Sequence, residues 1–325
     1  MQQYRDTNYA AVSAALHARE ARLLTRPLCE RMLEAPTAEE SAKAFIECGY
    51  PPLERCTLEA VEAMLARERA ELYREAGALA PDKRLVEFFE LKYDYHNAKL
   101  AVKARLTDED VSRLAIGCGR YDASALLRGE RGMLSSRMGR AMARAEKEAE
   151  GGDVRAAELT LDRACFEEMS ALAGETGNDF LIGYAALQID AVNLRTLVRT
   201  QRMGASAELL SAALLPGGHL PAERLRSARG DRLADLTRGS ALAGAGELAA
   251  AALNGGSLTA FERACDDALM QYLQRARRTP FGPEVVVGYL SAKEAEFTAV
   301  RTILSGKLAG LAAEDIRARL RLSYL

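Results

Sequence analysis

Apolar residues recur along this chain mainly at the three- and four-residue spacing of amphipathic helices. Phe88, Leu91, Tyr95 and Val102 fall at i, i+3, i+7 and i+14, which places them on one face of a helix. Residues 180–198 are apolar on nearly every side, as expected of a helix that packs against several neighbours. Runs of β-branched residues are rare, and the longest is VVV at 285–287. The pattern therefore predicts an all-α protein.

Three of the predicted helices carry the same arrangement of charged and apolar residues. They contain LKYDYHNAKLAVK (91–103), LQIDAVNLRTLVR (187–199) and KEAEFTAVRTILS (293–305), and we call them the marker helices. Each has an acid followed five residues later by a base. The acids are Asp94, Asp190 and Glu296, and the bases are Lys99, Arg195 and Arg301. Asn97 matches Asn193, and we expect these two residues and the three acids to be structural markers of a repeat.

A second motif precedes each marker helix. It reads LEAV from Leu58, LDRAC from Leu161 and FERAC from Phe261. Two motifs in the same order, three times, indicate helical repeats of about 100 residues each. We place these repeats at 1–106, 107–204 and 205–325. Thr37 and Thr107 are each followed three residues later by an acid, which is typical of helix N-caps.

Composition agrees with a helical, soluble protein and excludes some partners. About half of the residues are apolar (49%), 28% are charged, and Trp is absent. The formal net charge of −2 gives no overall attraction to nucleic acid or acidic lipid. Arginines do cluster within 128–144 and 224–232. We interpret these clusters as solvated helix faces, with docking of acidic partners as the alternative.

The marker helix at 91–103 also contains residue types that could perform acid–base chemistry. Asp94, His96 and Lys99 lie within two helical turns. The other two marker helices, however, have Val192 and Thr298 in place of His96. If the set were catalytic, we would not expect the other two marker helices to keep the acid and the base but lack the histidine. We therefore expect this cluster to be structural.

No other motif indicates a catalytic, cofactor or metal site. The six cysteines show no C-x-x-C spacing, and H-E-x-x-H and P-loop motifs are missing. GAGELA (244–249) matches a dinucleotide fingerprint only superficially, because no β-rich segment precedes it. We expect no catalytic residues, no cofactor and no metal.

The N-terminal residues carry charges where a signal peptide has an apolar run, and no window reaches about 18 apolar residues. This favours a cytoplasmic protein with reduced thiols.

The marker helices, together with both ends of the chain, resemble a known family. YDYHNAKLAVK (93–103), DAVNLRTLVR (190–199), residues 289–320 and residues 21–52 resemble the C subunit of archaeal and bacterial vacuolar-type (V-type) rotary ATPases, the counterpart of the d subunit in eukaryotes. The resemblance implies three similar helical units about a pseudo-threefold axis, forming a funnel. It implies a non-catalytic protein that sits on the membrane proteolipid ring, receives the D and F subunits of the central stalk, and transmits torque for ion transport or ATP synthesis. Such a protein is attached peripherally to the cytoplasmic face of the membrane through the complex.

The bases of the marker helices are our candidates for binding these partners. They share equivalent positions and could meet acidic side chains of the stalk or the ring. The candidates are Lys99, Lys103, Arg195, Arg199 and Arg301. Two other classes stay open at this point. One is a helical-repeat scaffold for an unrelated protein. The other is a helical enzyme built on Asp94, His96 and Lys99.

Overall fold

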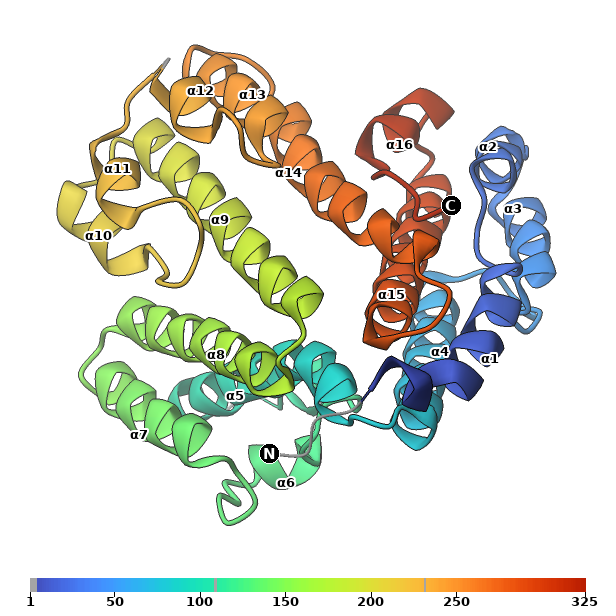
Figure 1. Ribbon diagram of the computed structural model, residues 1–325, viewed down its shortest axis with the longest axis horizontal. Coiled ribbons are helices and arrows are strands. Elements are labelled where there is room, and N and C mark those ends of the chain that lie inside the picture. The colour runs from blue at the N-terminus through green and yellow to red at the C-terminus, as the bar shows by residue number, and fades with distance from the viewer. Residues whose placement is uncertain (1–4, 108–109, 231) are drawn as a thin grey trace. The chain divides into compact units, whose positions relative to one another are not determined.

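The computed structural model describes residues 5–107, 110–230 and 232–325, and it is all-α throughout these ranges, as the sequence predicts (Figure 1). The chain divides into two compact units. The first unit contains residues 1–81 together with 237–325, and the second contains residues 82–236. The three repeats predicted from the sequence, and their boundaries, stay a prediction.

Among the described residues, the first unit contains eight α-helices and three short 3₁₀ segments. The helices are α1 (Ala10–Glu20), α2 (Arg26–Glu34), α3 (Ala38–Ala44), α4 (Leu58–Leu79), α13 (Ala243–Leu253), α14 (Leu258–Leu273), α15 (Pro283–Leu308) and α16 (Ala313–Arg319). The 3₁₀ segments are η1 (Asp6–Tyr9), η2 (Phe45–Cys48) and η4 (Gln274–Arg278). The third marker helix, α15, packs against α1, α4 and α16, and its buried side chains lie on several faces.

The second unit contains the first two marker helices, α5 and α9. Its elements are α5 (Arg84–Thr107), η3 (Ser112–Leu114), α6 (Ala123–Leu127), α7 (Ser136–Glu150), α8 (Val154–Thr176), α9 (Asp179–Arg202), α10 (Ala207–Ala213), α11 (Ala222–Ser227) and α12 (Arg232–Thr237), the last of which ends at the unit boundary. In Figure 1, α7 and α8 run side by side, and α8 also packs against α5 and α9. Long helices that pack on several neighbours explain why residues 180–198 are apolar on nearly every side.

Helix starts are fixed by side-chain caps at several of these elements. Thr37 Oγ1 accepts the backbone N–H of Glu40 at 3.1 Å, so α3 begins where the sequence predicts. Thr107 does not cap a helix, because it is the last residue of α5. Residues 108 and 109, which follow it in the predicted cap motif, lie outside the described residues.

The second repeat motif lies one helical turn later in its first copy than the sequence comparison placed it. Leu161 and Phe261 are fully buried on α8 and α14, whereas Leu58 is the first residue of α4 and is 52% exposed. Val61 is the buried equivalent, and Glu62 then matches Asp162 and Glu262. The sequence misplaces this copy because Leu58 and Val61 are both apolar and lie on one helix face, three residues apart.

Candidate functional site

The three marker acids are the most deeply buried charged side chains of their helices. Asp94 is 1% exposed, Asp190 2% and Glu296 4%. A carboxylate removed from water to this extent needs hydrogen-bond donors. In each case at least one backbone N–H donor comes from a loop that lies against the helix, and we call the three arrangements the first, second and third acid–loop contact.

In the first acid–loop contact, Asp94 on α5 holds the loop that precedes α6. Asp94 Oδ2 accepts from Arg120 Nε at 2.7 Å, and Oδ1 accepts the backbone N–H of Tyr121 at 3.2 Å. Arg120 also donates to Glu168 on α8 at 3.2 Å. Glu168 in turn accepts from the hydroxyl of Tyr95 at 2.7 Å. One arginine therefore connects the loop with both α5 and α8.

Asn97, one turn after Asp94, fixes the start of the same loop. Its Nδ2 donates to the carbonyl of Ile116 at 2.8 Å, and its Oδ1 accepts the N–H of Ile116 at 2.9 Å. The amide side chain thus pairs with the N–H and the carbonyl of one residue, as the backbone of a neighbouring β-strand would. The loop is thus held at two points.

The second acid–loop contact repeats this geometry on α9. Asp190 accepts the backbone N–H groups of His219 and Leu220, each at 2.9 Å. Asn193 pairs with both backbone groups of Leu215 at 2.8 Å. The matched spacing of acid and asparagine on α5 and α9 therefore corresponds to matched contacts.

The third acid–loop contact is made on α15 with a segment from near the start of the chain. Glu296 Oε2 accepts the backbone N–H of Leu24 at 2.6 Å, and Oε1 accepts the hydroxyl of Tyr50 at 2.5 Å. Lys293 forms an ion pair with the same carboxylate. The position of the asparagine is taken by Ala299, so the amide pairing has no counterpart here.

In each contact, one backbone N–H donor occupies the same structural position. Tyr121, Leu220 and Leu24 each come two residues before the first residue of a helix, namely α6, α11 and α2. Each marker acid therefore holds the backbone just ahead of a helix start. The donors are N–H groups, which every residue except proline offers.

Glycines let the first two loops come this close. A β-carbon at Gly119 would lie 2.2 Å from Oδ1 of Asp94, and one at Gly218 would lie 2.1 Å from Oδ1 of Asp190. The third copy has Arg22 at this position, and its acid is Glu296. Glutamate has one more methylene than aspartate, so the acid can reach the loop from farther away and a side chain fits.

Burial dominates the titration of the two aspartates. It raises the pKa of Asp94 to about 6, against the opposing effect of Arg120 and the N–H of Tyr121. Burial also raises the pKa of Asp190, against the hydrogen bonds from Leu220 and His219. Glu90, one turn before Asp94, has its pKa raised to about 7 by burial and by the charges of Asp94 and Glu87.

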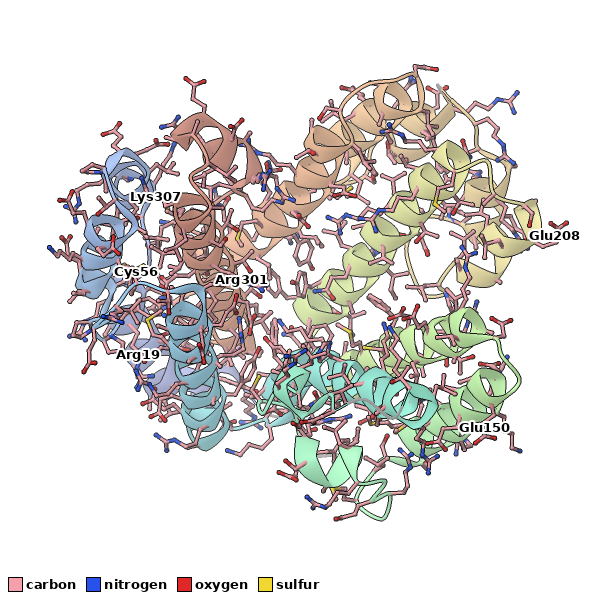
Figure 2. The ribbon with its side chains drawn as sticks, turned by 180° about the vertical axis from the view of Figure 1, so that it is seen from behind. Arg19, Cys56, Glu150, Glu208, Arg301 and Lys307 are labelled. Carbon is pink, nitrogen blue, oxygen red and sulfur yellow. The ribbon has the colours of Figure 1, made fainter. Side chains whose placement is uncertain are left out.

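Candidate partner-binding bases form ion pairs inside their own unit. Lys99 on α5 pairs with Asp162 on α8. Arg301 on α15, labelled in Figure 2, pairs with Glu62 on α4, the equivalent position. Lys103 pairs with Glu158 at 2.5 Å. These pairs keep one or both side chains partly in solvent. The remaining two candidates, Arg195 and Arg199, lie on α9, half-buried and exposed respectively.

Comparison with known proteins decides the family. Residues 12–319 match the family described as ATP synthase (C/AC39) subunit. The chain belongs to this family. The match spans both units and all three marker helices, so the resemblance noted in the sequence is confirmed.

Relatives of this chain are named as C subunits of V-type and A-type enzymes. The chain is 23% identical over 324 residues to the C subunit of the V-type sodium ATPase of Enterococcus hirae, covering 97% of this chain and 99% of the relative. It is 26% identical over 345 residues to the C subunit of the A-type ATP synthase of Methanocaldococcus jannaschii, covering 96% and 86%. The corresponding C subunit of the A-type ATP synthase of Haloferax volcanii is 31% identical over 172 residues, covering 50% and 48%.

The acid–base cluster of α5 does not converge on one point. Asp94 is bonded to Arg120, His96 Nε2 lies 3.1 Å from the carbonyl of Leu114, and Lys99 pairs with Asp162. Each side chain has a different partner. This geometry does not favour a catalytic set of Asp94, His96 and Lys99.

Sequence reasoning did not find the donors that satisfy the marker acids. Arg120, His219 and Tyr50 carry no shared motif, because the contacts they support are mostly to backbone. A glycine two residues before the backbone donor, Gly119 in the first contact and Gly218 in the second, could have located these loops in the sequence.

Within the described ranges, no group of His, Cys, Asp and Glu is placed to hold a metal ion. Nor is any helix in them long and apolar enough to cross a membrane.

Proposed function

We propose that this chain is a non-catalytic component of a V/A-type rotary ATPase. It links the D and F subunits of the central stalk to the membrane proteolipid ring and transmits torque between them. In this role it is attached peripherally to the cytoplasmic face of the membrane through the complex. The observation that carries the proposal is the family match over residues 12–319, with relatives named as the C subunits of V-type and A-type enzymes.

The acid–loop contacts are links of the kind that a torque-transmitting protein needs. Each marker helix is connected to the backbone ahead of another helix by hydrogen bonds to a buried carboxylate. Displacing one of these loops would leave a buried charge without donors, which is costly. Close-packed helices with such links deform little, as a torque-transmitting protein requires.

The bases on the marker helices remain our candidates for contact with the stalk. Lys99 and Arg301 are neutralised within the chain by Asp162 and Glu62, which are themselves partly exposed. A stalk carboxylate could replace the internal partner with little change in solvation. Exposed pairs of this kind contribute at most about 1 kcal/mol, so the exchange is energetically accessible.

Co-elution with the stalk tests the proposal directly. The purified chain is mixed with the D and F subunits from the same organism and applied to a size-exclusion column. We expect one peak that contains all three proteins in equal amounts. Separate elution, together with failure to bind detergent-solubilised proteolipid ring, would reject the proposed role.

A further inference from the structure

We propose that the second acid–loop contact is the first of the three to open, so that the loop end 218–221 is a built-in release point. The proposal goes beyond the proposed function, because it concerns the isolated chain and holds whether or not the chain joins a rotary complex.

The three contacts differ in the cation that supports the buried acid. Arg120 and Lys293 are 14% and 15% exposed, and both lie directly on their carboxylates. His219 is 64% exposed, and its Nδ1 lies 3.4 Å from Oδ2 of Asp190. Water screens an ion pair at such an exposed position. Asp190 therefore depends mainly on two backbone N–H groups.

The charge of the second contact is also conditional. An arginine is permanently charged, whereas a histidine is charged only when it is protonated. Arg120 also reaches Glu168 on a second helix, and His219 makes no comparable bridge among the described residues. The second contact thus lacks both the permanent charge and the link to another helix that secure the first.

A charged side chain from α8 holds the other end of this loop. Arg163 donates to the carbonyls of Ala212 and Leu214, at 2.9 and 3.1 Å. Asn193 holds Leu215. Within the part of the chain that the structure describes, His219 is the titratable side chain that contacts Asp190. Opening is therefore expected at 218–221, while 212–215 stays attached.

Opening of this loop end has a defined consequence. Leu220 is 8% exposed and lies just ahead of α11, which packs on α9. Losing the two N–H bonds frees Leu220 and the start of α11 while the first and third contacts stay closed. In a protein under torque, deformation would begin there.

Hydrogen exchange measures the three contacts side by side, because each acid accepts one equivalent amide. Protection factors are determined at pH 8 for Tyr121, Leu220 and Leu24 in the full chain. We expect Leu220 to be protected at least about tenfold less than either of the others, the difference that one hydrogen bond to a charged group supplies. Equal or higher protection of Leu220 at pH 8 would overturn the proposal.

Two reciprocal variants separate the role of the cation from general loop mobility. His219→Arg should raise the protection of Leu220 at pH 8 about twofold to fivefold, the range that exposed ion pairs supply, while leaving Tyr121 unchanged. Arg120→His should lower the protection of Tyr121. If His219→Arg folds normally but leaves Leu220 unchanged, the cation does not control the opening and the proposal fails.

Discussion

Glu296 accepts a hydrogen bond from the backbone N–H of Leu24 at 2.6 Å, although 272 residues separate the two along the chain. In the first two contacts the acid holds a loop downstream of its own helix. In terms of the predicted repeats, the acid of the first binds a loop near the start of the second, and the acid of the second binds a loop near the start of the third. The acid of the third binds a segment near the start of the first.

Adding a methyl group at Gly119 should weaken the first acid–loop contact. The new β-carbon would lie 2.2 Å from Oδ1 of Asp94, so the loop or the carboxylate has to move. We expect Gly119→Ala to lower the free energy of unfolding by about 1–3 kcal/mol, measured by urea denaturation. Gly117 in the same loop is the matched control, because a β-carbon there meets nothing within 4 Å. Equal effects of the two substitutions would contradict the close approach.

Removing the charge of Glu90 should stabilise the protein at neutral and higher pH. Burial, and then Asp94 and Glu87, raise the pKa of Glu90 to about 7 in the folded chain. The folded state therefore binds this proton more tightly than the unfolded state does. The stability that results is fully present below the unfolded pKa and is lost as the pH rises to about 7.

We expect Glu90→Gln to raise the free energy of unfolding at pH 8 by about 1–2 kcal/mol, reduced from the full shift because the carboxyl is only half-buried. Urea unfolding from pH 4.5 to 8 measures it. Glu150→Gln, at the exposed end of α7, is the control and should change little (Figure 2). A Glu90→Gln variant that is less stable at pH 8 would show that the folded protein favours the charged carboxylate, and would contradict the prediction.

The ion pair of Lys99 with Asp162 allows a test of stalk binding with a matched control. Lys99→Gln and Asp162→Asn both break this pair, but only the first removes the base. If Lys99 meets an acid of the stalk, Lys99→Gln should weaken binding about threefold to tenfold, and Asp162→Asn should leave it unchanged or tighten it. Titration calorimetry with the D and F subunits gives both values. Identical affinities of the two variants would remove Lys99 from the interface.

All six cysteines should be unreactive in the folded chain. Each is buried. Burial raises the pKa of Cys29 to about 11 and that of Cys48 to about 12, so little thiolate forms. We expect no fast reaction with a disulfide reagent at pH 8, and six equivalents of reaction after denaturation in guanidinium. Rapid modification of even one thiol in the native protein would contradict the burial.

The marker helices could be predicted from the sequence because burial leaves a pattern in side chains. An acid such as Asp94 inside an apolar helix, repeated at Asp190 and Glu296, points to a shared structural role. The loops that satisfy these acids were not predictable in the same way. Backbone N–H groups serve as the donors, so residues as different as Tyr121 and Leu220 fill one position. Only the close approach at Gly119 and Gly218 constrains the residue type.

The proposed role in coupling is tested most directly by ion transport in reconstituted vesicles. The membrane ring with its stator is assembled with the soluble ATPase and stalk, with and without this chain, and ATP hydrolysis and ion uptake are measured together. We predict that hydrolysis continues without the chain but that ion uptake is lost, and that adding the chain restores uptake. Ion uptake that is equally efficient without the chain would contradict the account.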